Sequence, residues 1–300
     1  MKSHSLTRFA WVSIGAAIAT MALKAFSYII TGSVGFLSDA AESLVNLAGG
    51  VMALAMLSIA ARPADDHHAY GHSKAEYFAS TVEGLLILVA AAGIGSAAVH
   101  RLLSPQPLEQ VRMGIAVSAV AAIVNLGAGW LLLRAGRRHG SVTLEANARH
   151  LFTDVWTSAG VIVGVAAVTL TGWQRLDPVI ALAVAVNIVW TGARILQGSV
   201  LGFMDTALPE EEQAAIRGVL DSYAGQGIHY HALRTRRAGQ RRFVSVHVLV
   251  PGEWTVQRGH QLTEQIENDL RAALPNVAPL THLESLNDPA SWRDISIDRS

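Results

Sequence analysis

The sequence contains no cysteine and few charged residues. Without cysteine, neither a disulfide framework nor thiolate ligation of a metal is possible. Charged residues make up 15% of the 300 residues, whereas soluble domains carry about 25%, so this deficit indicates a protein that lies in a bilayer. The net charge is zero, which argues against a nucleic-acid partner.

The charged residues are unevenly distributed along the chain. Residues 1–206 hold 24 of the 46 charged residues, and the last 94 residues hold the other 22. This shift predicts a membrane domain over residues 1–206, a soluble domain over residues 207–290 and a tail over residues 291–300. The basic N-terminus precedes a long apolar run without a clear cleavage site, so we interpret that run as the first membrane span.

Six apolar stretches are long enough to cross a membrane. Each exceeds the roughly 20 residues that a helix needs to cross about 30 Å of hydrocarbon. Lys and Arg in the short loops gather on one side, which predicts a multi-pass protein of the inner membrane with both termini in the cytoplasm. The predicted spans are Phe9–Ile30, Val34–Ala60, Tyr77–Leu102, Met113–Leu133, Leu144–Leu170 and Val179–Met204.

The soluble domain alternates predicted helices and strands in the order α-β-β-α-β. This order indicates a small cytoplasmic α+β domain of the ferredoxin-like kind. The five predicted segments are the helix Glu210–Tyr223, the strands His231–Arg236 and Arg242–Val250 joined by a turn over Arg237–Arg241, the helix Thr255–Leu274 and the short strand Leu280–Leu286.

Two pairs of polar residues lie inside predicted spans: Glu42 with Asn46, and His150 with Asp154. Each pair is spaced i, i+4, which places both side chains on one helical face. An Asp at the centre of a membrane helix costs about 2.5–3.5 kcal/mol on insertion scales, so such residues are rare and usually functional. The pairs supply four ligands, the number that a tetrahedral divalent metal requires. A polar contact between helices, or a helix end among lipid headgroups, is the alternative interpretation.

Other charged residues also fall within the spans. Asp39 lies one turn before Glu42 on nearly the same face and is a possible additional ligand. Lys24 and Glu83 lack a second ligand-type residue one turn away. We therefore interpret these two as helix–helix pairing partners or as charges at the end of a span.

Two more groups of ligand-type residues lie outside the spans. The loop after the second span contains Asp65-Asp66-His67-His68 followed by His72, and N and O donors within one short loop can close on a cation. A solvated polar loop is the alternative. A further set is spread over the soluble domain, where the sequence alone cannot bring its members together: His229, His231, His247, His260, His282 and Glu284.

Longer motifs surround these residues, from Gly32-Ser33-Val34 to Leu233-Arg234-Thr235-Arg236. Between them lie Glu42-Ser43-Leu44-Val45-Asn46, the run Arg62 to Glu76, His150-Leu151-Phe152-Thr153-Asp154 and Asp205-Thr206-Ala207-Leu208-Pro209. Over nearly its whole length the chain thereby resembles the cation diffusion facilitator family, close to its bacterial zinc- and iron-exporting branch. The run that starts Pro63-Ala64-Asp65-Asp66 is specific, whereas the i, i+4 pairs alone are weak signals.

The resemblance implies a homodimer that exchanges a divalent metal for protons, with zinc favoured and iron, cobalt, cadmium and manganese as further substrates. It implies three metal sites. The transport site falls on Glu42, Asn46, His150 and Asp154, the loop site on Asp65, His68 and His72, and a binuclear cytoplasmic site at the dimer interface on His231, His247, His260, His282 and Glu284. The branch usually has two Asp in span two and an Asp in place of Glu284, so this chain departs from it at these positions.

Two other classes of protein are alternatives to a transporter. An intramembrane metalloprotease also places His and Asp in the bilayer, but it needs a run such as His-Glu-x-x-His, which this sequence lacks. A membrane metal sensor or scaffold would use the cytoplasmic sites without transport and would not need His150 and Asp154 buried. We therefore expect a transporter and not an enzyme.

Overall fold

The computed structural model describes residues 3–139 and 142–293, and these form two compact units. The first unit combines residues up to Ala55 with Ala79–Leu196, and the second combines Met56–Phe78 with the chain from Gln197 onward. The second unit therefore contains the loop after the second helix together with the C-terminal domain. Each unit is described by itself below.

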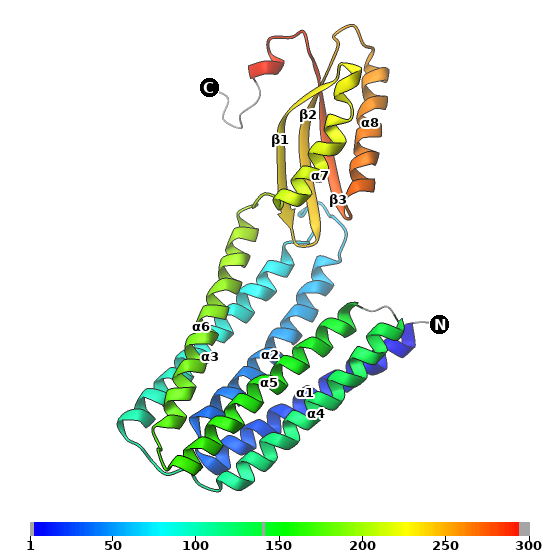
Figure 1. Ribbon diagram of the computed structural model, residues 1–300. Helices are drawn as coiled ribbons and strands as arrows, with labels where there is room; N and C mark the ends of the chain where they lie inside the picture. The colour runs from blue at the N-terminus through cyan, green and yellow to red at the C-terminus, as the bar shows by residue number, and fades with distance from the viewer. Residues whose placement is uncertain (1–2, 140–141, 294–300) are drawn as a thin grey trace. The chain divides into compact units, whose positions relative to one another are not determined.

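Six long helices confirm the six predicted spans (Figure 1). In the described part of the chain, all six are long and apolar enough to cross a membrane. Most extend a few residues beyond the predicted apolar stretch because their polar ends continue the helix. Their bounds are α1 Ser3–Thr31, α2 Val34–Ala60, α3 Ala75–Leu103, α4 Val111–His139, α5 Val142–Thr171 and α6 Leu176–Phe203.

Small side chains pack the helices of the first unit. Ala16 of α1, Ala128 of α4 and Ala148 of α5 share one buried cluster. Between α3 and α6, an added Cβ at Gly84 or at Gly192 would lie 3.3 Å from the other's carbonyl oxygen. Such close backbone approach is how helices associate in lipid, where no hydrophobic force drives them together.

The start of α2 is fixed by a carboxylate from another helix. Asp177 at the start of α6 accepts hydrogen bonds from the Ser33 hydroxyl (2.6 Å) and from the backbone N–H groups of Val34 (2.8 Å) and Gly35 (3.2 Å). These N–H groups have no partner within the helix, and a negative charge is favourable at a helix N-terminus. This contact, which the sequence did not reveal, sets the position of the polar residues farther along α2.

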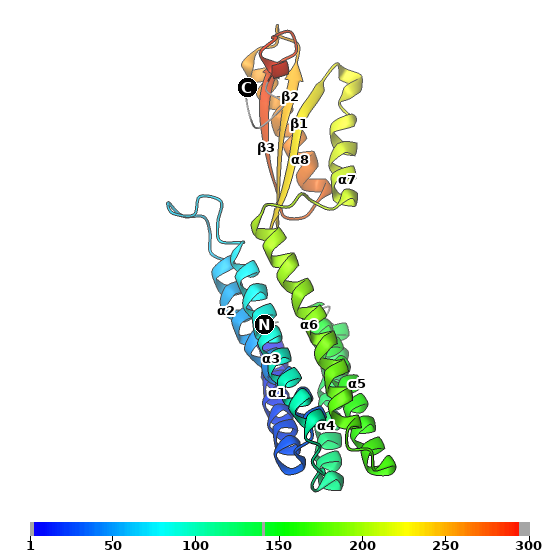
Figure 2. The ribbon, with the colours of Figure 1, turned by 90° about the vertical axis from the view of Figure 1, so that its left-hand side faces the viewer.

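The C-terminal domain has the predicted α-β-β-α-β order. Its sheet runs β1-β2-β3, with β1 and β2 antiparallel and β2 and β3 parallel, and Figure 2 shows β2 between the other two strands. Short 3₁₀ turns, η1 Ala224–Gln226 and η2 Ser291–Arg293, follow α7 and β3. The main elements are α7 Glu210–Asp221, β1 His229–Ala238, β2 Arg241–Val250, α8 Val256–Ala273 and β3 Val277–Ser285.

The two faces of this sheet differ. Val246 and Val248 of β2 pack with Ile216 of α7 and Ile266 of α8 in the domain's core. Since side chains alternate along a strand, His247 points to the opposite face. Figure 1 shows α7 and α8 on one side of the sheet and η2 on the other.

The predicted five-residue turn Arg237–Arg241 is wrong. The strands continue until Ala238 pairs with Arg241, which leaves a two-residue turn of Gly239 and Gln240. Gly239 has φ +58°, a conformation that a tight hairpin turn requires and that glycine adopts without strain. Arg237, Ala238 and Arg241, assigned to the predicted turn, lie in the paired ends of the strands.

Candidate metal centres

The polar pair of α5 is the clearest feature inside a span. His150 Nε2 lies 3.9 Å from Asp154 Oδ2, and the side chains are 50% and 11% exposed, respectively. Asp154 is thus buried one turn deeper along the helix than a half-exposed imidazole. An ion could approach through His150 and reach a buried negative charge at Asp154.

The polar pair of α2, Glu42 and Asn46, lies near Asp154 but does not form a common ligand cluster with it. Glu42 and Asn46 are both half-buried, and Glu42 is within electrostatic range of Asp154. However, the ligand atoms of Glu42, His150 and Asp154, all described residues, do not lie within 4.8 Å of one another. The structure places the four predicted ligands on facing helices without gathering them into one coordination sphere.

Asp39, the possible additional ligand, belongs to a different contact. Its Oδ1 accepts a hydrogen bond from the Lys24 ammonium (2.8 Å) and another from the Ser158 hydroxyl (3.0 Å). Lys24 also donates to the Ser43 hydroxyl (3.0 Å). The predicted helix–helix pairing of Lys24 is confirmed. The sequence did not reveal that Asp39 is its partner, or that Ser158 of α5 bonds the same carboxylate.

In the second unit, the loop residues gather as predicted. Ligand atoms of Asp65, His68 and His72 all lie within 4.8 Å of one another. His68 Nδ1 is 3.1 Å and His72 Nε2 is 3.4 Å from the Asp65 carboxylate. Backbone N–H groups of His68 and His67 also donate to Asp65, which lowers the pKa of that carboxyl below its usual range. A carboxylate that is already ionised suits cation binding.

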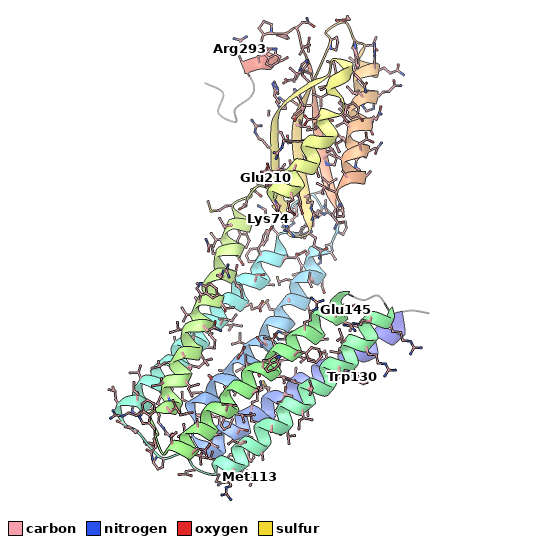
Figure 3. All side chains as sticks on the ribbon, in the orientation of Figure 1. Lys74, Met113, Trp130, Glu145, Glu210 and Arg293 are labelled. Atoms are coloured by element: carbon pink, nitrogen blue, oxygen red, sulfur yellow. The ribbon has the colours of Figure 1, made fainter. Side chains whose placement is uncertain are left out.

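The same loop contacts the β1–β2 hairpin within the second unit. Tyr70 packs edge-on against Phe243 of β2, and the Arg236 guanidinium lies over both rings. Lys74, labelled just before α3 in Figure 3, forms an ion pair with Asp205 (2.9 Å). Burial acts to raise the pKa of Asp205, but hydrogen bonds from Lys74 and Arg236 hold it below its usual range. The loop is therefore anchored between His68 and His72 and again just after His72.

The histidines of the C-terminal domain meet through strand register. His231 pairs with His247 between β1 and β2, and His247 pairs with His282 between β2 and β3. Paired residues project from the same face of a sheet, so the three imidazoles form a row. Glu284 lies two residues after His282 in the same strand and therefore on the same face.

Glu284 connects the members of this row. Its carboxylate is 2.9 Å from His231 Nε2, 3.1 Å from His247 Nδ1 and 3.5 Å from His282 Nε2. The carboxylate is 7% exposed and the His231 side chain 10%. Ligand atoms of His231, His247 and Glu284 all lie within 4.8 Å of one another, whereas His282 is 64% exposed and lies outside this group. Imidazoles and a buried carboxylate form a donor set for a metal that prefers N and O ligands.

Three further residues differ in their position relative to this cluster. Trp292 of η2 packs edge-on against the His231 ring, with ring centroids 5.8 Å apart, a contact that no sequence pattern indicated. His260, predicted as a fifth ligand, is exposed on α8. Because α8 packs on the valine face of the sheet, His260 is not part of the cluster within one chain. The sixth candidate, His229, lies exposed at the start of β1.

Comparison with known proteins assigns the chain to a family. The model of the cation efflux transmembrane domain matches residues 10–204, and the model of the cytoplasmic domain of cation efflux proteins matches residues 208–286. The chain belongs to the cation efflux, or cation diffusion facilitator, family. The family consists of transporters, so the chain is a multi-pass cation efflux protein of the cell membrane with a dimerisation domain.

Relatives cover almost the whole length of this cation efflux protein. An uncharacterised transporter of Synechocystis sp., sll1263, is 53% identical over 95% of this chain and 92% of its own length. The cation-efflux pump FieF of Yersinia pestis is 31% identical over 94% of each chain. The solved metal-bound C-terminal domain of the CzcD transporter from Thermotoga maritima is 25% identical, with a TM-score of 0.25, over 26% of this chain and 92% of that one.

Proposed function

We propose that the protein exports a divalent metal ion, with zinc or iron favoured, from the cytoplasm in exchange for protons, and that it acts as a homodimer with both termini in the cytoplasm. The observation that carries the proposal is the His150–Asp154 pair inside α5, with Asp154 buried in an apolar span. A buried carboxylate next to an imidazole is costly in a membrane and is explained by a transported cation. The family membership supports the same conclusion.

The chemistry of the four predicted ligands fits proton-coupled transport. Metal binds neutral imidazole and ionised carboxylates, so binding releases protons and protonation releases the metal. Because His150 is half-exposed and Asp154 is buried, the ion would meet the imidazole first. Movement of α2 towards α5 would then bring Glu42 and Asn46 to complete the coordination.

We further propose that the C-terminal cluster holds structural metal at the dimer interface. His231, His247, His282 and Glu284 supply the donors of one chain. Because His260 lies on the opposite side of the sheet from its own cluster, it would reach a cluster only as His260 of the partner subunit. Metal bound across two chains would tighten the dimer. The loop site of Asp65, His68 and His72 would hold a third ion beside the hairpin.

A membrane metal sensor or scaffold is the second candidate function. One observation favours it: the loop and C-terminal clusters are gathered into metal-sized groups, whereas the membrane residues are not. A sensor would bind metal at the two gathered clusters and show no flux. The two candidate functions therefore differ in metal flux, which can be measured directly.

Metal flux into sealed proteoliposomes tests the proposal. Zinc, iron, cobalt, cadmium and manganese are offered in turn, with and without a proton gradient. A transporter accumulates at least one metal, faster with the gradient, and Asp154→Ala stops it. Equal metal content in proteoliposomes and in empty vesicles would refute transport and leave the sensor. Flux at the same rate with and without the proton gradient would refute the exchange of metal for protons.

A further inference from the structure

A buried lysine inside α1 is not explained by metal binding. Lys24 is 2% exposed, and its positive charge cannot coordinate a cation. A charged residue in a membrane span is rare and usually functional. Its partners in the structure suggest what it does.

Asp39 joins three helices through this lysine. Its Oδ1 accepts hydrogen bonds from Lys24 of α1 and Ser158 of α5, and Asp39 itself lies on α2. Its other oxygen, Oδ2, is buried and has no hydrogen-bond partner among the described residues. An incompletely bonded carboxylate in an apolar interior is costly, and the 2.8 Å ion pair with Lys24 offsets part of that cost.

The contact lies one turn beyond the proposed transport site on both helices. Asp39 precedes Glu42 by three residues on α2, and Ser158 follows Asp154 by four on α5. The hydrogen bond between Asp39 and Ser158 therefore crosses between the helices on the side of the ligands away from the half-exposed His150. It closes the end of the site opposite to the one where the imidazole is accessible.

Apolar side chains lie farther in the same direction. Phe36 of α2 packs with Val161 and Val165 of α5, and all three are at most 5% exposed. These apolar residues alone would close the contact between α2 and α5 to water, without any charged group. Replacing a buried ion pair by apolar residues is often neutral or stabilising. A helix–helix contact that only stabilises the fold therefore does not require Lys24 and Asp39. A contact that must open to water during transport gains from polar groups, because water can hydrate them.

We propose that Lys24, Asp39 and Ser158 form a latch that closes the transport site on the side opposite to His150 and opens when metal is released there. The proposal rests on the proposed transport function and on its orientation. Lys24 and Asp39 act here as positioning residues. In the closed latch, Asp39 is paired with Lys24 and is not a metal ligand.

The absence of cysteine makes accessibility the direct test. Glu42→Cys places one thiol just inside the latch, and a membrane-impermeant thiol reagent is added to the outside of right-side-out vesicles. Gln174→Cys, in the exposed loop before α6, is the control for full labelling. Arg137→Cys, exposed near the end of α4, controls for sealed vesicles because it should react only after permeabilisation.

With the latch intact, we expect Glu42→Cys to react slowly from outside. Adding Lys24→Met with Asp39→Leu should raise its labelling rate about tenfold, as a minor open state populated at about 1–10% becomes a major one. Adding Ser158→Ala should raise the rate less, because only one neutral hydrogen bond is lost. Ser158→Ala also provides a second variant in case the double replacement does not insert as a monodisperse dimer.

Equal labelling of Glu42→Cys with and without these changes would overturn the latch. Labelling of Glu42→Cys as fast as Gln174→Cys in the otherwise unchanged chain would overturn it as well. Neither result depends on metal flux. Failure of the latch is therefore distinguishable from failure of the transport proposal, which the flux measurement decides separately.

Discussion

The membrane ligands and the C-terminal ligands differ in how completely the fold gathers them. In the C-terminal domain, backbone pairing of three strands places three histidines in a row around Glu284. In the membrane unit, the predicted ligands His150 and Asp154 approach each other to 3.9 Å, but both lie on one helix. Hydrogen-bonded strands have one register, whereas helices packed through small side chains can shift against each other.

This difference is what the two proposed tasks require. A site that only holds metal benefits from ligands fixed in place before binding. A transport site must gather its ligands and then release them, so it benefits from ligands on separate helices that move. The comparison predicts that changes in the membrane act on transport and changes in the C-terminal domain act on stability and dimerisation.

The largest expected effect is the loss of transport from Asp154→Ala or His150→Ala. Each removes one of four proposed ligands, and the span becomes more apolar, so insertion should not suffer. We expect flux in proteoliposomes to fall to the level of empty vesicles. Thr191→Ala, which removes a polar group from α6, is the matched control and should transport normally. Flux retained by Asp154→Ala would contradict the assignment of Asp154 to the transport site.

The second prediction concerns Glu284→Ala in the domain expressed from Leu208 onward. Zinc at about 100 times its dissociation constant should stabilise the unchanged domain by about 2.7 kcal/mol, or roughly 10–20 °C in melting temperature. Because Glu284 contacts all three histidines of the row, its loss should abolish most of this shift. Melting curves with zinc and with a chelator measure it.

Two variants on α8 sharpen that result. Glu264→Ala, exposed on the same helix, should leave the zinc shift unchanged. His260→Ala should leave metal bound to each chain but remove the zinc-dependent tightening of the dimer, seen by analytical ultracentrifugation. Tightening that persists in His260→Ala would contradict its role as a ligand from the partner subunit.

The third prediction concerns Asn46, where the chain departs from the family pattern. An amide oxygen brings no charge and releases no proton when metal binds. Asn46→Asp should therefore strengthen divalent binding and change the pH dependence or the metal ranking of flux. Asn46→Ala should reduce flux less than Asp154→Ala. If both Asn46 variants match the unchanged chain and Asp39→Ala alone reduces metal binding at equilibrium, Asp39 is the fourth ligand instead.

The smallest expected effect tests the scaffold rather than the ligands. Arg242 donates two hydrogen bonds to Glu212 (2.8 and 2.7 Å), which lowers the pKa of Glu212 below its usual range. This ion pair contributes about 1 kcal/mol to the free energy of unfolding, as expected for a partly exposed pair. The contribution is present above the ordinary Glu pKa of about 4.3 and is lost as the pH falls through the lowered pKa of Glu212.

Glu212→Gln should therefore lower the melting temperature of the domain by about 4–8 °C at pH 7 and by less as the pH falls below about 4. The zinc-dependent shift should be unaffected, because Glu212 lies outside the cluster. A stability difference that is the same at pH 7 and at pH 3 would contradict the ionic origin of this contact.

The sequence by itself determined the elements and the donor chemistry. Apolar runs longer than about 20 residues can only be spans, and the change in charge density marked the soluble domain. The spacing of His150 and Asp154 placed both on one helical face, and the loop residues from Asp65 to His72 are close enough along the chain to meet by themselves.

Tertiary structure decided which distant residues meet. The row of His231, His247 and His282 depends on strand register, which no local pattern specifies. His260 is separated from the row because α8 packs on the other face of the sheet. The pairing of Asp39 with Lys24 and Ser158, and the contact of Asp177 with the start of α2, depend on how helices far apart in sequence pack. Local spacing fixes a face of a helix or strand, but only packing fixes what that face touches.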